Sequence, residues 1–357
     1  MRGKHDRTEG QAIVLVALAL LVLVAAAGLA LDGANAFNQR RNTANAADAA
    51  AMAGTRSLID VQHSSATASS ICQTMQTYLN QHGLDQGTSG SSFPWQAYYV
   101  DRFGNRGAQA CNGSTLVSSP SSAVKGMAVD VRYTFNTLLM TVLNRNDLTV
   151  DASATAIYGP LGSTTGGDLI PVTISQSAAE NIMRPENSGG FVFGSNSGFF
   201  QVQAGNFGQI SFDPGGSNQT GNFGQDCNVD SPDAASHPDS QTYWWCQGSQ
   251  YPVNIGDTLH AQTGTIANSL ADEIQWRIEN RPDALVPVFS YSTGPGNNAI
   301  VSIVGFLPIH LTGFHVTGSD DSRWISATYS SSNPMITSGS INSNGLDTGV
   351  YAINLVK

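Results

Sequence analysis

Charged residues are scarce in this sequence of 357 residues. Asp, Glu, Lys and Arg make up 12% of the chain, about half of the roughly 25% that is usual for soluble domains. The hydrophobic fraction is 41%, and an intrinsically disordered chain would lack that much apolar material to bury. The sequence therefore predicts a folded body, and its length allows about two domains.

Positive charge is scarcer than negative charge. The net charge is -10 and the only adjacent basic pair that stands out is Arg40-Arg41. An acidic surface repels phosphate backbones, so nucleic acid is not expected as a partner.

Motifs that carry catalysis or hold cofactors are also missing. The sequence contains no H-E-x-x-H and no P-loop, and residues 194–198 carry Asn where G-x-S-x-G needs Ser. Asp347-Thr348-Gly349 occurs once, whereas an aspartic protease needs two carboxylates that share a proton; we interpret the triplet as a turn. A loop with Asp226, Asp230, Asp233 and Asp239 lacks calcium-loop spacing. We expect no enzyme activity, no cofactor and no metal site.

The four cysteines do not form Cys-x-x-Cys pairs, which argues against zinc or thioredoxin-type chemistry. An even number favours two disulfides in an oxidising compartment, and free buried thiols are the alternative. Four cysteines allow three pairings. We prefer Cys72–Cys111 and Cys227–Cys246, because each pair closes a loop within one candidate domain.

One uncharged apolar run reaches from Ala12 through Leu20 to Leu31. As a helix it would be about 30 Å long, which matches a bilayer core. A cleaved signal peptide is the alternative, with Ala25-Ala26-Ala27 as its cleavage site. The run is longer than a usual signal core, and its helical pattern continues without a break. We therefore predict a retained transmembrane helix, with the N-terminus cytoplasmic and the body extracytoplasmic.

Small side chains recur along the segment that follows the apolar run. One face of the predicted helix carries Phe37, Ala44, Ala47, Ala51, Gly54 and Leu58. Such a face lets two helix backbones approach closely, so we predict helix packing there. An alanine-rich stalk formed by helix propensity alone is the alternative.

The same region resembles a known family. Gly10-Gln11 precedes the apolar run, which ends in Leu-Ala-Leu-Asp-Gly, and Asn-Ala-Ala-Asp-Ala-Ala-Ala-Met-Ala-Gly follows at residues 45–54. Over about the first sixty residues the chain resembles TadE/TadG-like proteins. The resemblance implies a component of the tight-adherence (Flp, type IVc) pilus assembly and secretion machinery. It implies the lipid bilayer, other pilus-assembly or pilin-like membrane proteins, and a homo-oligomer as partners.

The sequence also departs from relatives of this kind. Cleavage after Gly3 would place Glu9 at the sixth mature position, whereas type IV prepilins have Glu at the fifth, so prepilin processing is not expected. The Asp-x-Ser-x-Ser metal motif that some relatives carry is missing, and metal-dependent adhesion is therefore not expected.

The rest of the chain predicts an α+β fold in two domains. Residues 1–60 would form the tail, membrane helix and stalk, residues 61–160 a small pilin-like α+β head, and residues 165–357 a mainly-β sandwich or distorted barrel. The domain boundary is predicted at residues 159–167, which are small, flexible and flanked by apolar runs. Periodicity predicts helices at 64–83, 137–143 and 268–280, and strands at 95–102, 127–135, 148–158, 169–174, 190–193, 199–202, 209–212, 285–291 and 299–316.

An aromatic run, Tyr243-Trp244-Trp245, lies beside Cys246. We favour packing over the disulfide, and an exposed binding patch is the alternative. The leading hypothesis is a membrane-anchored assembly component. The alternatives are a membrane-anchored adhesin or carbohydrate-binding protein with no pilus role, and an anchored hydrolase.

Overall fold

The computed structural model describes residues 8–84, 94–184, 189–194, 208–213, 227, 240–261, 268–294, 299–317, 322–329, 335–342 and 345–356. The chain forms two compact units. Unit 1 comprises Met1–Leu58, Thr67–Ile157 and Leu355–Lys357, and unit 2 comprises Ile59–Ala66 and Tyr158–Asn354. The fold is α+β, as the sequence predicts, and its two sheets are curled half-barrels.

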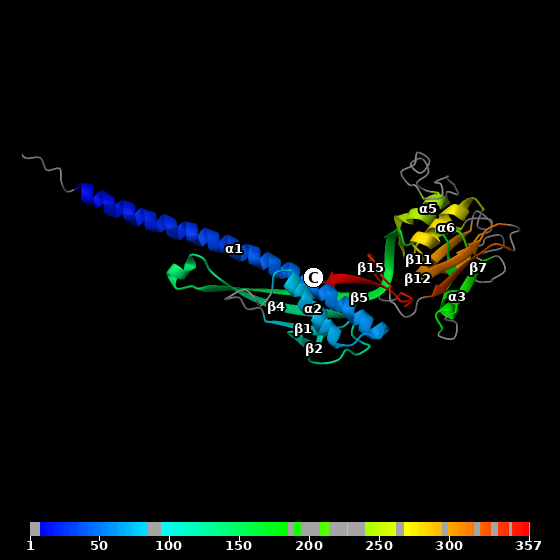
Figure 1. Ribbon diagram of the computed structural model, residues 1–357, viewed down its shortest axis with the longest axis horizontal. Coiled ribbons are helices and arrows are strands. Elements are labelled where there is room, and N and C mark those ends of the chain that lie inside the picture. The colour runs from blue at the N-terminus through cyan, green and yellow to red at the C-terminus, as the bar shows by residue number, and fades with distance from the viewer. Residues whose placement is uncertain are drawn as a thin grey trace, which may run out of the picture. The chain divides into compact units, whose positions relative to one another are not determined.

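Helix α1, Thr8–His63, is one uninterrupted element (Figure 1). Its apolar first half leaves large side chains exposed, whereas its second half is buried from Thr43 onward on a spacing of three and four residues. Ala46, Ala47, Ala50 and Ala51 are fully buried. The predicted stalk is therefore part of the core of unit 1, because alanine side chains let a helix lie close to neighbouring backbone.

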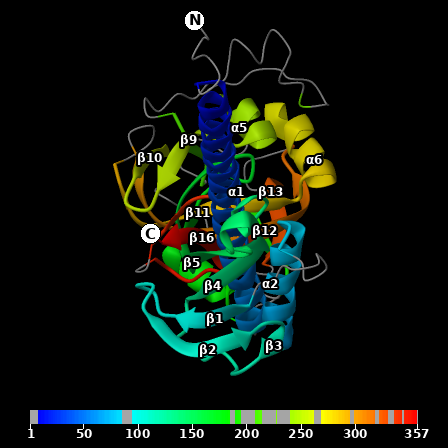
Figure 2. The same ribbon diagram turned by 90° about the vertical axis from the view of Figure 1, so that its left-hand side faces the viewer.

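The sheet of unit 1 is antiparallel. Its order is β5-β4-β1-β2-β3, with bounds Trp95–Val100 for β1, Arg106–Asn112 for β2, Thr115–Leu116 for β3, Gly126–Asn136 for β4 and Asp147–Gly166 for β5. Strands β1 to β4 have the Greek-key order, because β4 returns to pair with β1. Strands β4 and β5 pair from Gly126↔Ile157 to Asn136↔Asp147 without a register shift. Figure 2 shows α1 and α2 on one side of this sheet.

Helix α2, Ser69–Gln81, lies within the range predicted from periodicity. Ile71, Cys72, Met75 and Leu79 are buried, whereas Tyr78 is exposed. The Cys72–Cys111 disulfide joins α2 to β2. It closes a loop of 39 residues, which restricts the unfolded chain and thereby stabilises unit 1.

Unit 2 contains a sheet built on two long strands. Strand β11, Asp283–Thr293, pairs antiparallel with β12, Ile300–His315, and the order is β6-β11-β12-β10-β8. Strand β13, Trp324–Tyr329, adds to β12, and β7, Phe191–Gly194, adds to β13. The short strands are Ile174–Ser175 (β6), Ile210–Ser211 (β8) and Thr258–Ala261 (β10).

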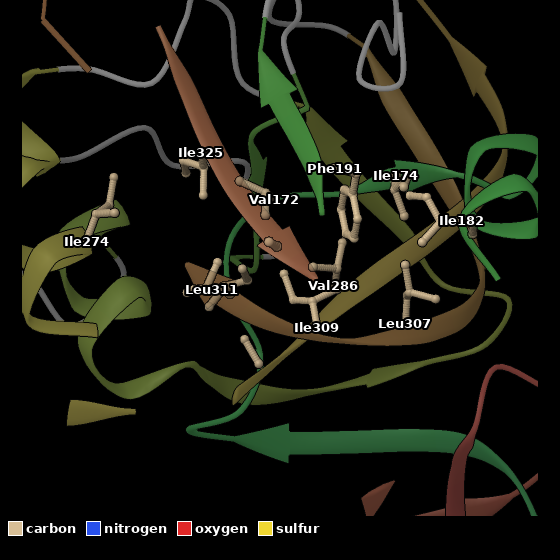
Figure 3. Packing of buried hydrophobic residues seen from close by; sticks show 14 of the residues in the cluster. Val172, Ile174, Ile182, Phe191, Ile274, Val286, Leu307, Ile309, Leu311 and Ile325 are labelled. Atoms are coloured by element: carbon tan, nitrogen blue, oxygen red, sulfur yellow. The ribbon is translucent and has the colours of Figure 1, made fainter. Parts of the chain in front are cut away.

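Figure 3 shows the core on this sheet, where Val172, Val286, Leu307, Ile309 and Ile325 converge. The helices of unit 2 are α3, Gln176–Ile182, α5, Gln241–Gln247, and α6, Ala271–Asn280, which follows the 3₁₀ turn η3, Asn268–Leu270. Ile182 and Ile274 bring α3 and α6 to the core.

The remaining strands of unit 2 extend β5 beyond residue 157. Ser249–Asn254 (β9) and Ser340–Ile341 (β15) pair antiparallel with β5, and Met335–Ile336 (β14) pairs parallel with β16, Val350–Val356. The predicted domain boundary at residues 159–167 lies next to the division of the two units between Ile157 and Tyr158. The segment is not flexible, because β5 continues through Gly166. Its small residues admit close neighbours: a Cβ on Gly159 would lie 2.5 Å from Ile341 Cγ2.

Several sequence predictions lie outside the described residues. These are the strand at 199–202 and the four-aspartate loop at 226–239. The strands at 106–112 and 350–356 and the helix at 176–182 were not predicted. The segments at 106–112 and 176–182 are rich in polar and small residues, which give no clear hydrophobic period.

Replacement of Gly126 tests the tight pairing of β4 and β5. A Cβ at this position would lie 2.0 Å from the Ala156 carbonyl oxygen and 2.8 Å from Ile157 Cα. Because these are backbone atoms that cannot move aside, we expect Gly126→Ala to lower the free energy of unfolding by about 2 kcal/mol or more. Chemical denaturation in detergent micelles measures the change.

Gly107→Ala in β2 is the matched control. Its Cβ would have only an ordinary contact, at 3.5 Å from the Tyr99 carbonyl oxygen, so the free energy of unfolding should change by less than about 0.5 kcal/mol. Equal effects of the two substitutions would contradict the register described for β4 and β5.

Candidate functional site

The first half of α1 presents a continuous apolar surface. The exposed fraction is 72% at Ile13, 57% at Leu20, 68% at Leu21 and 57% at Leu31. In the part of the chain that the structure describes, α1 is the one helix long and apolar enough to cross a membrane, with a mean hydropathy of 3.0 in its most apolar stretch. Its position near the N-terminus fits a membrane anchor or a signal sequence.

Asp32 marks the end of this apolar surface. Its side chain is buried, with 1% exposed, because the tip of the β4–β5 hairpin packs against α1 at this point. The tip contains the 3₁₀ turn η1, Met140–Leu143, which the sequence predicts as a short helix. The Asp32 carboxylate accepts backbone N–H bonds from Leu138 at 2.8 Å, Leu139 at 3.0 Å and Met140 at 2.6 Å. These N–H groups precede or open η1, where they have no partner inside the turn.

The electrostatics of Asp32 follow from these bonds. Burial by itself raises the pKa of a carboxyl group, but the three N–H donors stabilise the charged form and hold the pKa of Asp32 below its usual value. A depressed pKa means that the ionised carboxylate stabilises the fold above the normal pKa of Asp, and that this contribution is lost as the pH falls through the lowered value. The site therefore keeps an ionised acid directly beside the apolar run.

Most of the predicted helix-packing face is occupied within unit 1. Ala47, Ala51, Gly54 and Leu58 are buried inside unit 1. A Cβ on Gly54 would lie 2.7 Å from Met75 Sδ of α2, and Thr55 Oγ1 donates to the Ala156 carbonyl at 3.2 Å. The face thus packs on its own sheet and on α2. Its first two members, Phe37 and Ala44, remain exposed.

The preferred cysteine pairings are both present, with Cα–Cα distances of 5.8 Å for Cys72–Cys111 and 5.6 Å for Cys227–Cys246. These bonds indicate a body in an oxidising, extracytoplasmic compartment.

The aromatic run beside Cys246 is not a surface patch. Trp244 and Trp245 are fully buried and belong to the two hydrophobic clusters of unit 2. Tyr243 packs on the Cys227–Cys246 disulfide together with Trp276. The observation that favoured a carbohydrate-binding surface is therefore removed, since buried tryptophans cannot stack on a sugar.

A cluster of aromatic and polar side chains, which the sequence did not predict, joins the end of α1 to the rest of unit 2. Tyr351 donates its hydroxyl to Asp347 at 2.7 Å, and His63 Nδ1 lies 3.2 Å from the same hydroxyl. Tyr158 packs edge-on to the Tyr351 ring and donates to Gln62. Burial, followed by the nearby Asp347 charge, raises the pKa values of Tyr158 and Tyr351. These residues are separated by up to 288 positions, so no local pattern links them.

Two histidines of β12 lie at the protein surface. His310 pairs with Asp283 at 2.8 Å, and His315 stacks on Trp324. Asp347-Thr348-Gly349 forms a turn, as predicted, with Gly349 at φ +81°. Thr348 donates to the Phe306 carbonyl.

Two buried charged groups lie on α6. Arg277 donates to the carbonyls of Gly167 and Asp283, and burial lowers its pKa to about 10. Glu273 is 2% exposed, and burial raises the pKa of its carboxyl group to about 7. Their positions inside the unit indicate a structural role on the packed face of α6.

Unit 1 places the chain in a class of proteins in which a long N-terminal helix has an exposed apolar first half and a second half that packs within an α+β head. Comparison with known families specifies the class further. Residues 10–57 match the Tad family model, described as Flp pilus-assembly TadE/G-like. No curated protein and no solved structure matches the chain. The matched segment begins before the apolar run and ends on the buried face of α1. It therefore contains both the exposed apolar half and most of the buried half of the helix.

Asp32→Asn tests the attachment of the hairpin tip to α1. Loss of the charge weakens the three N–H bonds, since hydrogen bonds to ionised acceptors are stronger than those to neutral ones. We expect the amides of Leu138, Leu139 and Met140 to exchange with deuterium at least about tenfold faster. Asp48→Asn, which removes the same charge elsewhere on α1, should leave their exchange unchanged. Unchanged exchange in Asp32→Asn would show that the carboxylate does not hold the tip.

Glu273→Gln tests the buried acid of α6. A raised pKa means that the folded state binds the proton more tightly, so stability is complete below pH 4.5 and decreases as the pH rises toward 7. At pH 8 the glutamine variant should be more stable than the native protein by up to about 3 kcal/mol, and the difference should vanish near pH 4. Denaturation at a series of pH values measures it, with exposed Glu279→Gln as the control. A difference that does not depend on pH would disprove the assignment.

Proposed function

We propose that this protein is a membrane-anchored structural component of a tight-adherence (Flp) pilus assembly or secretion apparatus. The observation that carries the proposal is the Tad match at residues 10–57, which covers the apolar half of α1 and its buried continuation. The protein acts by helix contacts in the membrane and by protein contacts outside it, without catalysis.

The anchor is retained and crosses the membrane once. Three observations support this: the apolar run suits a bilayer core, α1 continues unbroken from it into the core of unit 1, and Asp32 holds the β4–β5 hairpin at its end. The disulfides favour an extracytoplasmic body, and the short basic N-terminal tail remains in the cytoplasm.

The exposed parts of α1 are the surfaces available for partners. Because Ala47, Ala51 and Gly54 are occupied within unit 1, contacts with other membrane helices use residues 13–31 instead. Phe37, with 74% exposed, lies just outside this run and is a candidate contact for a pilin-like protein or a second copy.

Deletion of the gene and two complementations test this function. The full chain should restore piliation, adherence and secretion. A second version, in which residues 1–31 are replaced by a cleavable signal, exports the body without its anchor and should not restore them. Membrane fractionation and protease shaving of a C-terminally tagged chain verify that the first product is anchored, with its body outside.

The outcomes separate the parts of the proposal. If deletion leaves piliation, adherence and secretion unchanged, the pilus role is wrong. If the soluble body restores them fully, the role stands but the retained anchor is not needed for it.

A further inference from the structure

The tip of the β4–β5 hairpin is unusually apolar for a turn. Turns between strands normally carry Gly, Asn, Asp, Pro or Ser, whereas this tip reads Leu-Leu-Met-Thr-Val-Leu from Leu138 to Leu143. The exposed fraction is 68% at Leu138 and 39% at Leu139. Large exposed leucines at a loop end are unfavourable in water and indicate an apolar environment.

The tip lies against the membrane-facing half of α1. Figure 1 shows the hairpin extending alongside the helix. At Gly28 the contact is close: a Cβ there would lie 2.9 Å from Leu139 Cβ and 3.3 Å from Leu139 Cδ1. Since Gly28 precedes Asp32 by one helical turn, the tip reaches about 6 Å along the helix into the apolar run.

The surfaces of tip and helix form one apolar groove. Its volume is about 390 Å³, and its walls include Leu20, Leu21, Val24, Leu29, Leu139 and Met140. The groove is continuous with the exposed surface of the predicted membrane span. Its chemistry is that of a site for hydrocarbon.

The backbone at the tip is also compatible with a bilayer. Hydrocarbon offers no hydrogen bonds, so backbone groups that enter it need partners within the protein. The N–H groups of Leu138, Leu139 and Met140 bond to Asp32. The N–H groups of Asn144 and Arg145 bond to the carbonyls of Thr141 at 3.0 Å and Met140 at 3.1 Å.

We propose that this hairpin tip enters the outer edge of the bilayer beside α1, with lipid acyl chains in the groove and over Leu138. The proposal rests on the membrane anchoring proposed above. Exposed Arg145 follows the tip and reaches lipid phosphates. Unit 1 is thereby held at two points, the helix and the tip, which fixes its orientation on the membrane surface.

Quenching by spin-labelled lipid tests the proposal on the full chain with its native disulfides. Leu138→Cys is labelled with an environment-sensitive fluorophore and reconstituted in phosphatidylcholine vesicles, with or without lipid that carries a nitroxide near the top of the acyl chain. Thr141→Cys reports on the same tip at a second exposed position. Leu21→Cys reports on the anchor itself.

Phe103→Cys is the matched control. Phe103 has the same exposed fraction as Leu138, 68%, but it lies in the β1–β2 turn, next to the Val100↔Gly126 end of the sheet. The length of β4 separates the two ends by about 33 Å. We expect quenching at residue 138 at least as strong as that at residue 21, because residue 21 lies about 15 Å from the outer end of the apolar run and is therefore farther from a shallow nitroxide. Quenching at residue 138 should be at least threefold stronger than at residue 103.

The outcomes distinguish the tip from the anchor. Quenching at residue 21 with none at 138 and 141 would overturn the tip proposal and leave the anchor in place. No quenching at any position would overturn both. Absence of quenching at 138 together with disulfide-linked dimers through unlabelled Leu138→Cys would show that a second copy, rather than lipid, covers the tip.

Discussion

The close packing of α1 on the sheet of unit 1 is the constraint from which the rest of that unit follows. Alanine side chains at residues 46, 47, 50 and 51 are fully buried, and Thr55 bonds directly to the backbone of β5. Larger residues would move the helix away from the sheet and expose its core. Because the same helix carries the apolar run, that run continues into the core of unit 1 without a break in the helix.

Asp32 lies where the apolar run of α1 ends and the packed half of the helix begins. A buried carboxylate is unfavourable unless it is hydrogen-bonded, and here three backbone N–H groups stabilise the charged form. The same bonds fix the hairpin tip beside the helix. One acidic residue thus serves as the end of the apolar run and as the attachment point of a distant loop, and this dual role gives a physical reason for its presence in the segment that matches the Tad family.

Unit 2 is stabilised by groups that would be functional candidates if they were exposed. Trp244 and Trp245 fill its two hydrophobic clusters, Arg277 bonds to backbone carbonyls, and Tyr351 connects Asp347 to His63. Each is surrounded by protein. Their burial is consistent with a body whose role is to present a surface, as the proposed assembly function requires.

The sequence by itself determined the features that depend on neighbours along the chain: the apolar run, helix α2, the long strands β4, β11 and β12, and a family segment at the N-terminus. Periodicity carries this information because it reflects which face of an element is buried. It also favoured the observed cysteine pairing, because each pair closes a loop within one candidate domain.

Only the tertiary structure decided how distant segments meet. The attachment of Leu138 to Asp32 spans 106 residues and the contact of Tyr351 with His63 spans 288. The strand that runs through the predicted domain boundary at 159–167 exists because β9 and β15 supply hydrogen-bond partners from far along the chain. A sequence pattern shows that a residue will be buried, but the partner that buries it is chosen by the packing of the whole fold.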